Sequence, residues 1–365
     1  MGGTYVRRIG IIGLILWISF TVTVSASGGP NVSARNAVLI EQSTGRILYE
    51  KKAHEERLIA SITKIMTAII AVESGKMDQT VTVSKNATHT EGSSIYLEEG
   101  EKIKLKDLVY GLMLRSGNDA AVAIAEYLGG SVEGFSYLMN EKAAWIGMQN
   151  SSFDNPHGLD SESHYSTAYD MALLMKHAMD NETFRKISGT EWYKSENRTY
   201  SWKNKNKLLT AYYEYCTGGK TGYTRAAGRT LVSSAHKDGM DLIAVTLNAP
   251  DDWNDHQALF EWGFKNFKLE TLQKEGKLSE QWIFDDRTAY FPNSKKYPLT
   301  QEEVSRVEAK WIPKQEKNSD VLGRMFYELD DQEIASSNVV STNPKNKHSI
   351  MSLTMEVFFQ LIGVK

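Results

Sequence analysis

The sequence is poor in cysteine and has no excess of charge of one sign. Its 365 residues include one cysteine, Cys216, and 42 Lys and Arg against 45 Asp and Glu. One cysteine cannot form a disulfide within the chain or supply a thiolate cage for a metal. A chain without a basic excess lacks the charge with which nucleic-acid-binding proteins neutralise phosphates. We therefore expect no nucleic-acid partner, no metal and no other cofactor.

The remaining composition is that of a folded, enzyme-sized protein. Apolar residues make up 41% of the chain and charged residues 24%. These values are close to those of an ordinary globular protein and exclude an intrinsically disordered chain. The length is large for one hydrophobic core and sufficient for two domains.

Residues 1–26 have the features of a secretory signal peptide. Arg7 and Arg8 precede an apolar run from Ile9 to Val24, and Val24-Ser25-Ala26 ends in a small residue suited to cleavage. The run has 16 residues, fewer than the roughly 20 of a membrane-spanning helix, and an uncleaved anchor is the alternative. Cleavage removes two arginines and no acid, so the formal charge changes from −3 to −5. We expect an exported protein.

The end of the chain, residues 341–365, is predicted to be a linker followed by an amphipathic membrane anchor. A helix over 349–365 would be apolar around most of its circumference, because its polar residues recur every three or four positions. One narrow face of that helix would carry Ser349, Ser352, Glu356, Gln360 and Gly363, and nearly all the other residues are apolar. Lys345 and Lys347 precede this run and suit anionic headgroups. The alternative is a helix docked on the protein's own core or on a partner.

Between these ends, the predicted elements follow the order strands, helices, strands, helix. The pairs 37–40 with 47–49 and 230–235 with 242–247 are typical of β-hairpins. Helical periodicity covers 61–73, 105–114, 119–128, 132–145, 167–179 and 253–267. This order predicts an α/β domain of the α+β type over 27–268, with helices packed on one antiparallel sheet. Residues 269–340 are predicted to form a small, mainly β domain.

The sequence Ser61-Ile62-Thr63-Lys64 lies at the start of a predicted helix. Residues three apart share one helix face, so the side chains of Ser61 and Lys64 can meet. A serine hydroxyl needs a base, and a lysine can be that base when burial or a second cation lowers its pKa. The helix start also gives Ser61 a backbone N–H suited to an oxyanion. The alternative is that Ser61 only caps the helix and Lys64 is solvated.

Two further motifs follow in the chain. Ser116-Gly117-Asn118 separates two predicted helices, where the hydroxyl could relay a proton and the amide could hold Lys64 or a substrate carbonyl. The alternative is a turn in which Asn118 caps the next helix. Lys220-Thr221-Gly222 supplies a charge, a hydrogen bond and room for close backbone approach, which suits an extended peptide with a carboxylate. Its alternative is a glycine-rich turn before a strand.

Taken together, in this order and spacing, the three motifs resemble those of penicillin-binding proteins and class A β-lactamases. The sequence is similar to the low-molecular-mass penicillin-binding proteins, which are serine-type D-alanyl-D-alanine carboxypeptidases, and to the sporulation-type enzymes of bacilli. The stretches that carry the resemblance are 59–68, 112–121, 155–160 and 219–224. The resemblance implies a β-lactamase/transpeptidase-like domain with a helical subdomain, followed by a small C-terminal β-sandwich.

The resemblance also implies roles for individual residues. Ser61 would be acylated by a peptidoglycan stem peptide ending in D-Ala-D-Ala, Lys64 would accept the proton, and water would release the product. Ser116 would lie beside them as the third catalytic residue. β-Lactam antibiotics would trap Ser61 covalently.

The substrate-binding residues are likewise carried over by resemblance. Asn118, Lys220, Thr221 and Gly222 would contact or surround the substrate, and the backbone N–H of Tyr223 would complete the oxyanion hole with that of Ser61. The enzyme would lie outside the cytoplasm on the outer face of the cell membrane, or of the forespore membrane, and would limit cross-linking of the wall or spore cortex.

The sequence departs from the family at one place and leaves more than one activity open. Some members carry an arginine after the strand that ends near Asn248, but 249–255 contains none, so carboxylate binding would fall to Thr221, Lys220 or Arg225. A class A β-lactamase would have a Glu with Asn four residues later, and no Glu between 119 and 219 does. The same motifs are also compatible with a transpeptidase and with a non-catalytic wall-binding protein.

The remaining histidines and the cysteine are interpreted as structural. His157 lies in a predicted turn, and Cys216 precedes the third motif by four residues. His54, His89 and His164 do not have the spacing of metal ligands.

Overall fold

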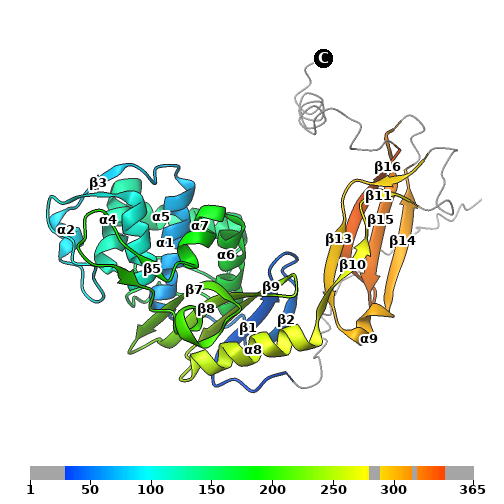
Figure 1. Cartoon of the computed structure of the whole chain (residues 1–365), viewed down its shortest axis with the longest axis horizontal. Helices are drawn as coiled ribbons and strands as arrows, with labels where there is room; N and C mark the ends of the chain where they lie inside the picture. The colour runs from blue at the N-terminus through cyan, green and yellow to red at the C-terminus, as the bar shows by residue number, and fades with distance from the viewer. Residues whose placement is uncertain (1–28, 279–287, 315–318, 342–365) are drawn as a thin grey trace, which may run out of the picture.

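The computed structural model describes residues 29–278, 288–314 and 319–341 (Figure 1). The predicted signal peptide at 1–26 and the predicted anchor helix at 349–365 lie outside these ranges. Within them, no helix combines the length and the apolar character needed to cross a membrane.

A five-stranded antiparallel sheet forms the centre of the first part of the chain. Its strand order is β2 (Ile47–Lys51), β1 (Asn36–Glu41), β9 (Met240–Leu247), β8 (Gly228–Lys237) and β7 (Cys216–Thr224). Strands from the beginning of the chain therefore pair with strands some 200 positions later, as expected from the order of the elements. The fold class is confirmed, and β7 is the last strand in the order.

The two faces of the sheet are covered by different helices. Residues alternate between faces along a strand, and in β1 the side chains of Val38 and Ile40 join one buried cluster while Leu39 joins another. The first cluster packs against the helical part, and the second against α8 (Asp252–Asn266). Figure 1 shows α8 on one side of the sheet and the helices that precede it in the chain on the opposite side.

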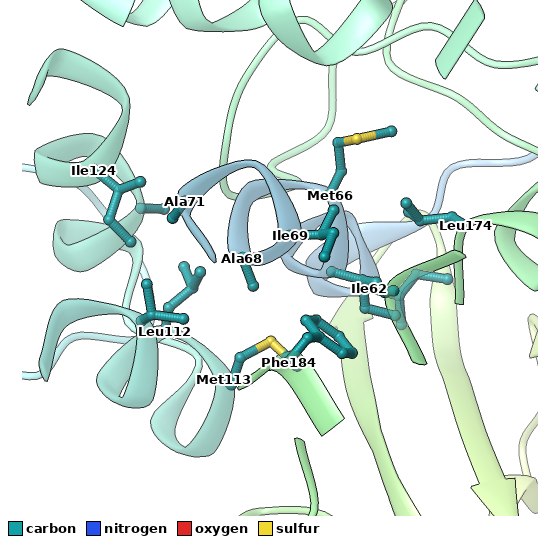
Figure 2. Close-up of a cluster of buried hydrophobic side chains, with 14 of the residues drawn as sticks. Ile62, Met66, Ala68, Ile69, Ala71, Leu112, Met113, Ile124, Leu174 and Phe184 are labelled. Carbon is teal, nitrogen blue, oxygen red and sulfur yellow. The ribbon is translucent and has the colours of Figure 1, made fainter. Parts of the chain in front are cut away.

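Helix α1 (Lys64–Glu73) lies at the centre of the helical part. Figure 2 shows apolar side chains of the segment around α1, such as Ile69, packed among side chains of the surrounding elements, such as Leu112 and Phe184. The surrounding helices are α2 (Lys85–Thr88), α3 (Leu105–Tyr110), α4 (Asn118–Gly129), α5 (Val132–Ile146), α6 (Ala168–Asp180) and α7 (Glu182–Ser188), with a π-helical turn η3 (Leu208–Tyr212) before β7. Two small antiparallel ribbons complete this part: β3 (Thr80–Thr82) with β4 (Lys102–Lys104), and β5 (Trp192–Tyr193) with β6 (Trp202–Lys203).

Two predicted helices differ from the structure at the ends that carry the motifs. The first begins as a 3₁₀ turn, η1 (Ala60–Thr63), and becomes α-helical only at Lys64. The predicted helix over 105–114 ends in a π-helical turn, η2 (Gly111–Arg115). Short non-α turns of this kind are frequent at functional sites.

After α8 the described chain consists mainly of strands. Strands β10 (Lys268–Gln273) and β13 (Lys295–Leu299) form one antiparallel pair. A five-stranded sheet has the order β11 (Gly276–Lys277), β12 (Tyr290–Phe291), β16 (Gln332–Val340), β15 (Val321–Leu329) and β14 (Val307–Pro313). A separate small core, which includes Met325, Tyr327 and Val339, holds this part together. The single turn α9 (Gln301–Val304) follows β13.

Arg46, in the turn between β1 and β2, joins the two parts of the chain. Its Nη1 donates to Glu303 Oε2 at 3.0 Å and to the carbonyl of Pro298. Its guanidinium also lies 5.3 Å from the ring centroid of Phe267 and 5.2 Å from that of Tyr297. The side chains of Arg46 and Glu303 are only 16% and 6% exposed, so this ion pair is largely desolvated.

Candidate active site

Ser61 and Lys64 lie next to each other where η1 passes into α1. Lys64 Nζ is 2.9 Å from Ser61 Oγ, 2.7 Å from Asn118 Oδ1 and 2.6 Å from the carbonyl oxygen of His157. The Lys64 side chain is completely buried, and Ser61 is partly exposed. The alternative that Lys64 is a solvated side chain is therefore wrong. The alternative that Ser61 caps the helix is also wrong, because neither η1 nor α1 begins with a side-chain cap.

The three partners of Lys64 fix the direction of its lone pair once the amine is neutral. The carbonyl of His157 can only accept a hydrogen bond. Asn118 must also present its oxygen to Lys64, because its Nδ2 donates to the carbonyl of Glu91 at 2.5 Å. A neutral amine has two N–H bonds and one lone pair, so the two N–H bonds go to these oxygens. The lone pair then points at Ser61, the one partner of the three that can donate a proton.

The surroundings of Lys64 favour this neutral form. Burial in the protein interior lowers the pKa of Lys64 well below its usual value, and the positive charges of Lys220 and Lys205 lower it further. The carboxylate of Asp119 acts in the opposite direction. A lysine with a lowered pKa can take the proton of a serine hydroxyl.

Ser116 and Asn118 lie at the junction between η2 and α4. Ser116 has a left-handed backbone with φ of 65° and is 5% exposed. Gly117 precedes α4 as its cap, whereas the Asn118 side chain contacts Lys64 and Glu91, so the alternative that Asn118 caps the helix is wrong. Gly92, with φ of 93°, allows its loop to lie close to the Asn118 side chain, because a Cβ there would be 2.7 Å from Asn118 Nδ2.

Lys220, Thr221 and Gly222 lie within β7 and not in a turn before it. Lys220 is 2% exposed and its Nζ donates to the carbonyl of Thr221 at 2.7 Å. Burial, with a further contribution from the charge of Lys205, lowers the pKa of Lys220 to about 7. A Cβ on Gly222 would be 2.9 Å from the backbone nitrogen of Ser61, so only glycine allows β7 to lie this close to Ser61. Tyr223, the next residue, is exposed.

The structure thus brings the three motifs together, and Lys64 bonds directly to Ser61 and Asn118. Lys220 is close enough for its charge to act on Lys64. The motifs did not indicate two further participants: the carbonyl of His157, which was expected to belong to a plain turn, and Lys205, whose charge reaches both buried lysines. A backbone carbonyl has no sequence signature, and Lys205 lies outside the three motifs.

The segment 249–255, which has no arginine, contributes an acid at the end of the sheet. Asp252 accepts hydrogen bonds from Arg229 Nε at 3.0 Å and from Nη2 at 2.5 Å. Arg229 lies on β8 directly opposite Tyr223 of β7. Arg225, one of the residues predicted to bind a carboxylate, is exposed in the turn between β7 and β8.

Cys216 does not offer a reactive thiol. Cys216 is buried at the start of β7, and burial raises the pKa of its thiol to about 12, which keeps it protonated. In the part of the chain that the structure describes, no three His, Cys, Asp or Glu side chains are grouped as a metal site requires.

Comparisons with known proteins match this chain to D-alanyl-D-alanine carboxypeptidases. The family model described as D-alanyl-D-alanine carboxypeptidase matches residues 21–251. D-alanyl-D-alanine carboxypeptidase DacF of Bacillus subtilis is 40% identical over 255 residues, which are 67% of this chain and 65% of the relative. DacC of Escherichia coli is 38% identical over 268 residues, 66% of this chain and 64% of the relative. Both matches therefore span slightly less than two thirds of the relative.

Solved structures show the same likeness over a longer stretch. Penicillin-binding protein 5 of Haemophilus influenzae matches with a TM-score of 0.74 and 30% identity, over 87% of this chain and 98% of that one. Penicillin-binding protein 6B of Escherichia coli matches with a TM-score of 0.70 and 27% identity, over 86% of this chain and 97% of that one. Both matches extend beyond the first sheet and its helices.

Proposed function

The chain belongs to the D-alanyl-D-alanine carboxypeptidase family, and from that premise we propose that it removes the terminal D-alanine from peptidoglycan stem peptides ending in D-Ala-D-Ala. The observation that carries the proposal is the buried Lys64, whose lone pair is aimed at Ser61 by Asn118 and the carbonyl of His157. A lysine with only a structural role would not need this arrangement, in which Ser61 is the one of its three partners that can give it a proton.

In the first step, Ser61 Oγ attacks the carbonyl carbon of the penultimate D-alanine. Lys64 takes the hydroxyl proton as the new C–O bond forms. Collapse of the tetrahedral intermediate breaks the C–N bond, and a proton is delivered to the nitrogen of the leaving D-alanine. Ser116, buried two residues before Asn118, is proposed as the relay for that proton. The products of the step are free D-alanine and an ester on Ser61.

In the second step, water hydrolyses the ester. Lys64, again neutral, takes a proton from the water, whose oxygen attacks the ester carbon, and the proton returns to Ser61 Oγ as it leaves. The backbone N–H groups of Ser61 and Tyr223 are proposed to stabilise the oxyanion in both steps, since Gly222 brings β7 against Ser61.

The substrate is proposed to bind along β7. This strand is the last in its sheet, and an extended peptide can add to such an edge through main-chain hydrogen bonds. Asn118 would contact the peptide from the opposite side, and Thr221 with Lys220 would hold the terminal carboxylate. β-Lactam antibiotics would acylate Ser61 in the same way, and the resulting acyl-enzyme would be hydrolysed slowly.

We also propose where the enzyme acts. Residues 1–26 would direct export, 27–268 would form the catalytic domain and 269–340 the small β domain. Residues 341–365 would attach the protein to the outer face of the cell membrane, or of the forespore membrane. There it would limit cross-linking of the wall or of the spore cortex, a proposal that rests on the resemblance of the sequence to the sporulation-type carboxypeptidases of bacilli.

The test is mass spectrometry of the protein after penicillin treatment, combined with a D-alanine release assay. The unaltered protein should carry one adduct on Ser61, and Ser61→Ala should lose both the adduct and D-alanine release. Ser234→Ala is the matched control, because Ser234 begins the second Ser-x-x-Lys sequence of the chain and its buried hydroxyl contacts Thr217 at 2.8 Å. Persistent D-alanine release by Ser61→Ala would refute the mechanism.

A further inference from the structure

The residue before the nucleophile has an unusual backbone. Ala60 has φ of 50°, a left-handed conformation that residues other than glycine seldom adopt, and it is buried. Such a conformation persists only where the surrounding structure holds it. The contacts of the Ala60 carbonyl show what holds it here.

The Ala60 carbonyl is bound by a relay of buried side chains. Thr63 Oγ1 lies 2.8 Å from the Ala60 oxygen, and His164 Nε2 lies 2.8 Å from Thr63 Oγ1. Thr63 and His164 are 0% and 1% exposed. The other ring nitrogen, Nδ1 of His164, accepts from the backbone N–H of Asp154 at 3.1 Å.

These contacts determine the direction of every proton in the relay. Because His164 Nδ1 accepts a hydrogen bond, the proton of the neutral ring is on Nε2, which donates to Thr63 Oγ1. The Thr63 hydroxyl must then donate to Ala60, because a carbonyl only accepts. Burial lowers the pKa of His164 to about 4, so the ring is in this neutral form at neutral pH.

The Ala60 carbonyl also packs closely against the backbone at Gly158. Gly158, with φ of 86°, lies so close that a Cβ there would be 2.0 Å from the Ala60 oxygen. Gly158 directly follows His157, whose carbonyl binds Lys64. One loop therefore contacts both the base and the peptide that precedes the nucleophile.

The orientation of this carbonyl sets the orientation of the Ser61 N–H. The peptide between Ala60 and Ser61 is trans, and in a planar trans peptide the C=O and N–H point in opposite directions. The Ser61 nitrogen lies against β7, so close that a Cβ on Gly222 would be 2.9 Å from it. Holding the Ala60 oxygen toward Thr63 thus turns the Ser61 N–H toward β7.

We propose that Thr63 and His164 are positioning residues that aim the Ser61 N–H into the oxyanion hole through the Ala60 carbonyl. The proposal rests on the proposed function, since it concerns the oxyanion of the same reaction. Neither side chain touches the substrate. Both act by fixing a peptide plane, and this is a role for His164 beyond that of a buried structural histidine.

Paired substitutions test the proposal on the full chain. Thr63→Val keeps the shape of the side chain and removes the hydroxyl, whereas Thr63→Ser keeps the hydroxyl. Thr67→Val is the matched control, because Thr67 is buried on α1 four residues after Thr63, and its hydroxyl donates at 2.6 Å to the carbonyl of Pro156 and not to Ala60. The measurements are the rate constant of acylation by penicillin, its apparent dissociation constant, and the unfolding temperature.

We expect Thr63→Val to slow acylation by about 10- to 100-fold, since loss of one oxyanion donor lowers such rates by about 10²- to 10³-fold and a misdirected donor loses part of that. The dissociation constant should change little, because the oxyanion forms only after binding. Thr63→Ser should restore most of the rate. Thr67→Val should lower the unfolding temperature without a comparable loss of rate.

A second pair keeps the test decisive if Thr63→Val does not fold. His164→Asn can still accept from Asp154 but has no donor at the Nε2 position, whereas His164→Gln can place an amide N–H there. Slower acylation in the Asn variant than in the Gln variant supports the relay. Equal acylation rates within the foldable pair, or equal losses in Thr63→Val and Thr67→Val, would overturn it. If the unaltered protein is not acylated at all, the proposed function itself fails, which is a separate outcome.

Discussion

Replacing Lys220 by methionine should stabilise the protein at neutral or lower pH while abolishing its activity. Lys220 is 2% exposed and its pKa is lowered to about 7, mainly by burial. Below pH 7 the ammonium is charged in both the folded and the unfolded chain, and the folded state then bears the full free-energy cost of burying that charge. Methionine fills a similar volume without a charge.

The size of the effect follows from the pKa. A lysine in an unfolded chain titrates near 10.4, so between pH 7 and about 10 the unfolded state binds one proton more than the folded state does. The free energy of unfolding then rises with pH by about 1.4 kcal/mol per unit. Summed over this interval of about 3.4 pH units, the cost below pH 7 is about 5 kcal/mol, against which the bond of Lys220 to the Thr221 carbonyl contributes about 1 kcal/mol.

The assay is urea unfolding followed by circular dichroism, for the unaltered protein and Lys220→Met, between pH 6.5 and 9.5. At pH 6.5 the variant should be more stable by about 2–4 kcal/mol. This advantage should shrink as the pH rises, by about 1.4 kcal/mol per unit above pH 7, because the unaltered protein loses its buried charge. A difference in the free energy of unfolding that stays constant across the pH range, or a variant that is less stable at pH 6.5, would show that burial of the Lys220 charge does not destabilise the folded state.

Two further predictions concern residues outside the candidate site. Arg46→Met should lower the free energy of unfolding by about 2–4 kcal/mol, because it leaves the carboxylate of Glu303 buried without its partner. A double-mutant cycle with Glu303→Gln measures the coupling, and additive effects would contradict a buried ion pair. Removing residues 349–365 should release the protein from membrane fractions and leave penicillin labelling intact. A truncated protein that still sediments with membranes would rule out the anchor.

The local pattern of the sequence predicted most of the elements that position the site. The short apolar runs over 37–40 and 242–247 indicated strands, and β1 and β9 are found there as neighbours. The Lys237-Asp238-Gly239 turn indicated the second hairpin, and Asp238 and Gly239 have the positive φ values of 53° and 79° that such tight turns need. These features depend on residues adjacent in the chain, so the sequence contains the information.

The site was predictable in its residue types but not in its arrangement. The three motifs indicated Ser61, Lys64, Asn118 and Lys220, and the structure brings them together. The π-helical turn before Ser116 and the 3₁₀ turn at Ser61 were predicted as α-helix. Helical periodicity does not distinguish these forms over a single turn, because they differ only in which carbonyl each N–H selects.

The sequence by itself determined a serine and a lysine three positions apart and the order of strands and helices that makes an antiparallel sheet. Only the tertiary structure decided that Lys64 is buried with a lowered pKa and lies against Ser61. Its two acceptor partners, Asn118 and the carbonyl of His157, come from 54 and 93 positions away. The charges that lower its pKa come from β7 and from Lys205. A pKa and the direction of a lone pair depend on burial and on neighbours in space, which local spacing along the chain does not specify.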